Sequence, residues 1–228
     1  MIHCCEESFF EMFWVQQVQK IVRCLLHDLS NCLTGNLALS ELYCAKEQEL
    51  PSEKFIAIRD NCYKEREILK QLSQLHHTCP GNVAYIDLRS FVEDLRPLFM
   101  RLLPPCAKFN LDNENFSEIL IKFDVAFLQR IFLLTILLAT EIFENTPAPE
   151  LNIHLLGDID RIVCSVKCNT VLGLQVEDLI EIKADNLSLA QVGGPMVRFY
   201  MEKYHGSFLY SVTPDGYSSI NLTFPIVK

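Results

Sequence analysis

The chain has 228 residues, of which 50% are hydrophobic, and its formal net charge is −9. This apolar content excludes a disordered chain, and the length suffices for one large domain or two small ones with buried cores. Because an acidic surface repels phosphate backbones, nucleic-acid binding is not expected to be its main function.

Ten cysteines are spread along the chain, with no CxxC pair and no spacing typical of a zinc site. Cys24 and Cys32 lie among apolar helix residues, and Cys164 and Cys168 lie in a strand-like run. The sequence therefore predicts reduced, buried thiols, as in a cytosolic protein, and no metal site.

Neither the N-terminus nor any apolar run predicts a targeting or membrane segment. The opening stretch MIHCCEESFFEMFW carries acidic residues and has no basic region, unlike a signal peptide. The longest apolar run, residues 131–140, is much shorter than the roughly 20 residues that a membrane span requires. We expect a soluble cytoplasmic protein with no membrane contact.

Two long helices are predicted in the first third of the chain. Residues 9–48 contain no proline and one glycine, Gly35, and their apolar side chains recur at helical spacing. This stripe consists of Val15, Val18, Val22, Leu25, Leu29, Cys32 and Leu33. Pro51 and Ser52 mark the start of a second amphipathic helix over residues 52–78, so an antiparallel hairpin is expected.

A hairpin of two helices cannot enclose a core by itself. Two hairpins can, and we therefore expect a dimeric four-helix bundle through residues 9–78. The alternative is that the rest of the same chain covers the two stripes.

The pattern changes after residues 78–82, TCPGN, which predict a helix stop and a linker. Helices are predicted over residues 87–99, 125–144 and 189–204, with Asp87 and Asp124 as caps of the first two and Gly206 ending the third. Strand-like runs occupy residues 107–113, 118–123, 150–156 and 160–168, and two more strands join through TPDG, residues 213–216.

Helices gathered with a mostly antiparallel sheet predict a two-layer α/β sandwich. The fold class is therefore α+β, with a helical-hairpin domain over residues 1–80 and the sandwich over residues 81–228.

His27 and Asp28 form an ionisable pair in the middle of the first predicted helix. His27 lies two residues from both Leu25 and Leu29, and two residues turn about 200° around a helix. The imidazole is therefore expected to be exposed. An exposed imidazole can attack phosphorus near pH 7, although an exposed His-Asp pair is more often simply solvated surface.

The neighbours of His27 suit such a reaction. Asp28 is placed to hold one ring nitrogen and to stabilise the cation formed on attack. Asn31 and Thr34 follow at i+4 and i+7, where they would orient a water or a phosphoryl oxygen. Lys20 and Arg23 on the same face would attract an acidic partner, with a solvated face as an equal alternative.

The stretch HDLSNCLTG, residues 27–35, resembles the H box of bacterial two-component sensor histidine kinases. The resemblance covers most of residues 9–78, where the family has its dimerisation and phosphotransfer hairpin. It implies that His27 is the phosphoacceptor, that Asp28 is the acidic helper, and that Asn31 occupies the position tied to phosphatase activity. We also expect Arg23, Ser30 and Thr34, on the polar side of the same helix, to contact the partner.

Residues 85–228 are more weakly similar to the ATP-binding domain of those kinases. DVAFLQRIFLLTILLATEI, residues 124–142, has the frame of the family's N box, but the two asparagines that hold magnesium and phosphates fall on Leu134 and Leu138. No D-x-G-x-G follows the strand at 161–168, and the glycine-rich lid is reduced to Gly193-Gly194-Pro195. No residues here suit the binding of a triphosphate.

A histidine hairpin beside a degenerate nucleotide domain resembles the histidine phosphotransferases of the ChpT and sporulation types. This implies a relay between response-regulator receiver domains through His27, with no cofactor of its own, because the receiver would bring the magnesium. The alternative from another class is a non-catalytic docking or regulatory module. An active ATP-dependent kinase is disfavoured by Leu134 and Leu138.

Overall fold

The computed structural model describes residues 2–46, 52–76, 81–113, 120–143, 148–157, 161–169, 189–212 and 217–226. The chain divides into two compact units, Met1–His77 and Thr78–Lys228. The loop before Ser52, most of the TCPGN linker, residues 158–160 and the predicted turn at residues 213–216 lie outside the described residues.

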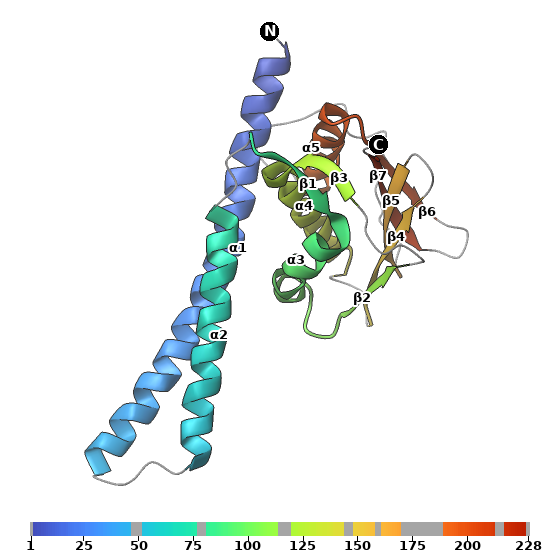
Figure 1. Ribbon diagram of the computed structural model, residues 1–228. Coiled ribbons are helices and arrows are strands. Elements are labelled where there is room, and N and C mark those ends of the chain that lie inside the picture. Colours follow the sequence, from blue (N-terminus) through green and yellow to red (C-terminus); the bar gives the residue numbers. More distant parts are fainter. Residues whose placement is uncertain are drawn as a thin grey trace. The chain divides into compact units, whose positions relative to one another are not determined.

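The first unit is a helical hairpin (Figure 1). Helix α1 spans Ile2–Lys46 and helix α2 spans Ser52–His76, and the two pack along each other. Helix α1 begins earlier than residue 9, where the apolar periodicity starts, because residues 2–8 contain no proline or glycine to stop it.

The apolar side chains of α1 lie on two different faces of the helix, and the residues of the predicted stripe are divided between them. Ile21 and Leu25 are buried together with Ile68 and Leu75 of α2, so they form the core of the hairpin. By contrast, several large apolar side chains of α1 are exposed. We call them the open apolar face: Met12, Val15, Leu26, Leu33 and Leu37.

A polar layer crosses the hairpin near its closed end. The amide of Asn36 donates to Glu65 Oε1 at 2.9 Å, and Asn61 donates to Asn36 Oδ1 at 3.0 Å. These bonds join α1 to α2 at one register, because a shift of either helix would leave half-buried polar groups unpaired.

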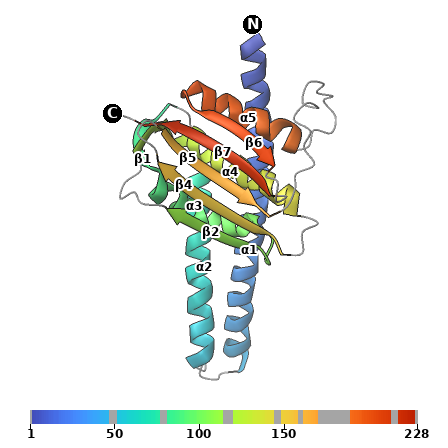
Figure 2. The same ribbon diagram turned by 90° about the vertical axis from the view of Figure 1, so that its right-hand side faces the viewer.

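The described part of the second unit combines two sheets and three helices, which Figure 2 shows from the side of the main sheet. Its helices are α3 (Leu88–Leu102), α4 (Val125–Phe143) and α5 (Leu189–Lys203). Its strands are β1 (Val83–Asp87), β2 (Lys108–Asn113), β3 (Leu120–Asp124), β4 (Glu150–Gly157), β5 (Arg161–Cys168), β6 (Ser207–Val212) and β7 (Ser218–Pro225).

Five strands form the main sheet in the order β2-β4-β5-β7-β6. The β2–β4 pair is parallel and the other three pairs are antiparallel, as expected for a mostly antiparallel sheet. Strand β1, which was not predicted, pairs with β3 in a separate two-stranded sheet. The three helices lie on one side of the main sheet, which confirms the α+β sandwich (Figure 1).

Helix α4 forms the centre of this unit, since nearly all of its side chains are buried. Both predicted caps are present. Asp87 accepts from the backbone of Arg89 at 3.2 Å, and Asp124 accepts from the backbone of Ala126 at 2.9 Å. A carboxylate at this position satisfies amides that have no partner within the helix.

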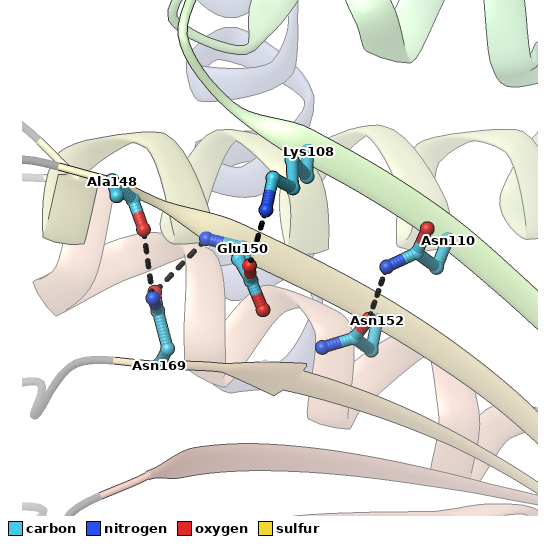
Figure 3. A network of polar contacts seen from close by, with 6 residues as sticks. All are labelled: Lys108, Asn110, Ala148, Glu150, Asn152 and Asn169. Atoms are coloured by element: carbon cyan, nitrogen blue, oxygen red, sulfur yellow. Dashed lines mark hydrogen bonds and ion pairs between the residues drawn. The ribbon is translucent and has the colours of Figure 1, made fainter.

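A polar network joins the parallel strands β2 and β4 (Figure 3). Lys108 bonds Glu150 at 3.1 Å, and Asn110 donates to Asn152 at 2.8 Å, each from the residue directly opposite. Asn169 closes one end by accepting from the Glu150 backbone at 2.9 Å. These cross-strand pairs fix the register of the edge strand β2.

The end of α5 differs in detail from the prediction. The residue with left-handed backbone is His205, at φ 59°, and not Gly206. Gly206 is required for another reason. A Cβ built on it would lie 2.7 Å from the carbonyl oxygen of Thr223 and 2.8 Å from Cε of Met201.

The prediction of buried thiols holds for only part of the chain. Cys164 and Cys168 are buried, whereas Cys24, Cys62 and Cys106 are exposed and Cys32 is half-buried. Among the helices that the structure describes, none combines the length and apolar content needed to cross a membrane.

Candidate active site

The imidazole of His27 protrudes from the middle of α1. Its side chain is 74% exposed, compared with 37% for Asp28. The helical turn explains the difference, because Asp28 is rotated about 100° from His27 towards the side that packs on α2. The structure therefore confirms the expected exposure of the ring.

Both polar neighbours of His27 approach the same ring atom. The Asn31 amide nitrogen lies 3.3 Å from His27 Nδ1, and the nearer carboxylate oxygen of Asp28 lies 3.6 Å from it. The first distance is a hydrogen bond, and the second is slightly beyond one. Neither contact involves the other ring nitrogen, Nε2.

Helix α1 presents three distinct sides. The open apolar face is centred near Leu26, and the buried hairpin side near Ile21 and Leu25 is rotated from it by roughly 120°. His27 occupies the third side, about 100° from Leu26. A helix in a four-helix bundle has this distribution, with two packed sides and one that faces water.

Of the residues predicted to contact a partner, Arg23 and Thr34 lie on that third side, and Ser30 lies between His27 and the open apolar face. Arg23, Ser30 and Thr34 are all exposed, and they flank His27 within two turns of the helix. Their roles stay predictions. Together with His27 and Asn31 they form a polar strip, and Lys20 extends it by one turn.

The two α4 positions that align with the metal-binding asparagines of the N box carry leucine. Leu134 and Leu138 are 0% and 2% exposed, so both side chains belong to the core of α4. The adjacent Thr135 is also buried, and its hydroxyl donates to the carbonyl of Ile131 at 2.8 Å. These residues do not fit a magnesium–nucleotide complex, since a hard cation takes oxygen ligands.

Sequence reasoning missed a cluster of aromatic and charged groups around Arg130. The buried Arg130 donates to the hydroxyl of Tyr200 at 3.2 Å, and its guanidinium lies 5.4 Å from the centre of the Phe127 ring. The sequence feature that could have indicated this cluster is the spacing of Phe127 and Arg130, which lie one helical turn apart.

Asp124 also has a larger role than the predicted helix cap. Besides the α4 amides, it accepts from the backbone of Gly81 at 2.5 Å. Burial, the Asp124 charge and a hydrogen bond to that carboxylate together raise the pKa of Tyr204 to about 12. Within the described part of the chain, no group of three or more His, Cys, Asp or Glu side chains is arranged to hold a metal.

Comparisons with known proteins identify the fold. Among solved structures, the chain is similar to the histidine kinase AdeS of Acinetobacter baumannii, with a TM-score of 0.52 and 14% identity over 89% of this chain and 98% of that one. It is similar to the mycobacterial sensor histidine kinase MprB, with a TM-score of 0.50 and 13% identity over 62% of this chain and 97% of that one.

A third similar structure is histidine kinase ThkA in complex with the response regulator protein TrrA, with a TM-score of 0.52 and 13% identity over 97% of this chain and 66% of that one. No protein-family model and no curated protein matches the sequence. At these identities the likeness concerns the fold. The chain therefore has the fold of the histidine kinases of known structure, with a long N-terminal helix and an α/β domain.

Proposed function

We propose that this protein is a histidine phosphotransferase that relays a phosphoryl group between receiver domains of response regulators. The observation that carries the proposal is the exposed His27 side chain, whose Nδ1 faces Asn31 and Asp28 while Nε2 is not engaged by either. A nucleophile in a relay has to reach a phosphorus atom held by another protein, so exposure is a requirement.

The chemistry follows from the two ring nitrogens. The Nε2 lone pair attacks the phosphorus of an aspartyl phosphate, the P–O bond breaks, and the receiver's aspartate leaves as a carboxylate. Asp28 holds the Nδ1 proton and stabilises the cation that forms. The reverse step transfers the group from Nε2 to the aspartate of a second receiver.

The core position of Leu134 and Leu138 supports a relay without ATP. A kinase of this fold would have to hold magnesium and phosphates on α4, and leucine supplies no oxygen for this. The magnesium would come with the receiver domain, and the protein would have no cofactor of its own.

The partners are inferred from the fold and from the surface. ThkA was crystallised with the response regulator TrrA, and this supports a receiver as the partner here. The second partner is another copy of the chain, through residues 9–78. Its support is the open apolar face, where Leu33 and Leu37 are 51% and 59% exposed. Pairing two hairpins would bury this face and leave the side of His27 in water.

A labelling experiment tests the relay. The chain is incubated with potassium phosphoramidate, a small phosphoryl donor, and separately with a panel of receiver domains charged with the same donor. We expect acid-labile phosphate on the chain in both cases, and we expect His27→Ala to abolish it.

Two outcomes would contradict the relay. Tight receiver binding without phosphoryl uptake from any source would indicate a docking module. Phosphate acquired from ATP and magnesium alone would indicate a kinase, in conflict with the buried leucines on α4.

A further inference from the structure

The ring nitrogen Nδ1 of His27 has two competing neighbours. The Asn31 amide nitrogen is 3.3 Å away, and the nearer carboxylate oxygen of Asp28 is 3.6 Å away. Because the ring is 74% exposed, its rotation can bring Nδ1 closer to one neighbour or to the other. A neutral imidazole nitrogen forms one in-plane bond, so both contacts cannot be satisfied together.

These two neighbours have opposite chemical requirements. An amide nitrogen can only donate, so its bond to Nδ1 requires a lone pair there and places the ring proton on Nε2. An ionised carboxylate can only accept, so its bond to Nδ1 requires a proton there and leaves the lone pair on Nε2. Only the second tautomer has a nucleophilic Nε2.

We propose that Asn31 restrains the reactivity of His27 by stabilising the tautomer with its proton on Nε2, in opposition to Asp28. Asn31 is thus a positioning residue that acts through the ring. This inference rests on the proposed phosphotransfer function and concerns the regulation of the same site. A contact that moved the ring towards Asp28, such as a docked receiver, would raise the population of the reactive tautomer.

The reacting step balances in either case. In the reactive tautomer, Nε2 forms a bond to phosphorus, the donor's bond to phosphorus breaks, and Nδ1 keeps its proton against Asp28. In the restrained tautomer, the Nε2 proton has to leave before the same bond can form. Phosphoramidate as donor releases ammonia, which carries away one proton.

Long-range proton–nitrogen correlation spectra of the full-length ¹⁵N-labelled protein measure the tautomer directly. The measurement is made at about pH 9, where an ordinary imidazole is neutral. The six histidines are separated by the loss of one signal in His27→Gln. We expect Asn31→Ala to shift His27 towards the tautomer with a proton on Nδ1, and Asn31→Asp to shift it further. Asp28→Asn is expected to shift it the other way.

A matched control comes from the same helix. Gln16 is an exposed amide on the same side of α1, three turns before His27, so Gln16→Ala removes an amide away from the ring. This variant should leave the tautomer unchanged. An Asn31→Ala spectrum that matches the parent, or that moves towards a proton on Nε2, would overturn the proposal.

Uptake from phosphoramidate gives the functional measure. We expect Asn31→Ala to increase the rate of His27 phosphorylation by roughly two- to tenfold, the range that one neutral hydrogen bond supports. Asp28→Asn should decrease the rate by about tenfold or more, as for other groups that orient a reactive histidine. An Asn31→Ala rate equal to or below that of the parent would refute the restraint.

The two proposals fail in different ways. If the parent protein never becomes phosphorylated on His27, the phosphotransfer function is wrong, whatever the spectra show. If the parent is phosphorylated but Asn31→Ala changes neither tautomer nor rate, the function stands and the restraint by Asn31 is wrong.

Discussion

The carboxylate of Asp124 connects three segments of the second unit. It caps α4 through Ala126 and Phe127, binds the backbone of Gly81, and raises the pKa of Tyr204 beyond α5. A fully buried carboxylate is costly unless donors surround it, and here backbone and phenol donors do so. The residue therefore stabilises the junction of the linker, α4 and α5.

The raised pKa of Tyr204 makes stability depend on alkaline pH. The folded state holds the phenol proton up to a pKa of about 12, mainly because of burial, whereas an unfolded tyrosine loses it near pH 10. Its contribution is complete below about pH 10 and is lost as the pH rises towards 12. In urea unfolding at about pH 9 and about pH 11, the free energy of unfolding should decline less between the two pH values for Tyr204→Phe than for the parent. Equal declines would contradict this assignment.

Thiol reactivity should follow burial. Burial raises the pKa of Cys168 to about 12 and that of Cys164 far above its usual range, so neither forms the reactive thiolate. Cys24, Cys62 and Cys106 are exposed. Peptide mapping after brief treatment with an alkylating reagent should find these three modified, and Cys164 and Cys168 modified only in urea. Equal labelling of all five in the folded protein would contradict the buried positions.

At the scale of elements, the three sides of α1 differ in what covers them. One side packs on α2, the open apolar face is unpartnered in a single chain, and the side with His27 faces water. The polar layer of Asn36, Asn61 and Glu65 aligns the two helices and so sets which residues of α2 lie opposite the half of α1 that carries His27.

Two glycines in helices or at their ends should respond in opposite ways to alanine. Gly206→Ala places a methyl group 2.7 Å from a backbone oxygen and should destabilise the protein by about 1–3 kcal/mol. Gly35 lies inside α1, and a Cβ built on it would lie 3.6 Å from the Asn61 amide nitrogen, which is an ordinary contact. Gly35→Ala should therefore stabilise the hairpin by up to about 1 kcal/mol. Denaturant unfolding of both variants measures these changes. A stable Gly206→Ala would show that the α5–β6 turn can relax.

The whole molecule is expected to be a dimer of 26.2 kDa chains. The double variant Leu33→Glu, Leu37→Glu places unpaired charges on the open apolar face and should give monomers, because burying such charges is costly. Leu42→Glu is the matched control, since Leu42 is exposed on nearly the opposite side of α1. Sedimentation velocity measures the masses, and circular dichroism confirms that the helices persist. A parent protein of monomeric mass would refute the dimer.

Much of the fold was predictable, with identifiable exceptions. The predicted helices, caps and most strands are present because periodicity and cap residues act locally. Strand β1 was missed because its five residues alternate only weakly between exposed and covered positions. The parallel pairing of β2 with β4 depends on residues about 40 positions apart, and no local pattern encodes it.

The candidate site shows the same division. The exposure of His27 was predictable from its spacing to Leu25 and Leu29, and the proximity of Asp28 and Asn31 follows from helical geometry. The competition of both for Nδ1 was not predictable, because it depends on side-chain rotamers. The exposure of Cys24 and Leu33 was also missed, because a stripe about 100° wide does not show which of its edges a neighbour covers.

The amino-acid sequence alone determined the two long helices, the exposed side of the first on which His27 lies, and the absence of asparagine at positions 134 and 138. Only the tertiary structure decided which apolar residues of α1 the hairpin covers, which strands pair, and that Asp124 joins Gly81 to α4. The physical reason is the distance along the chain over which each interaction acts. Helix formation and caps depend on neighbours within a few residues, whereas burial and strand pairing depend on groups that only the folded chain brings together.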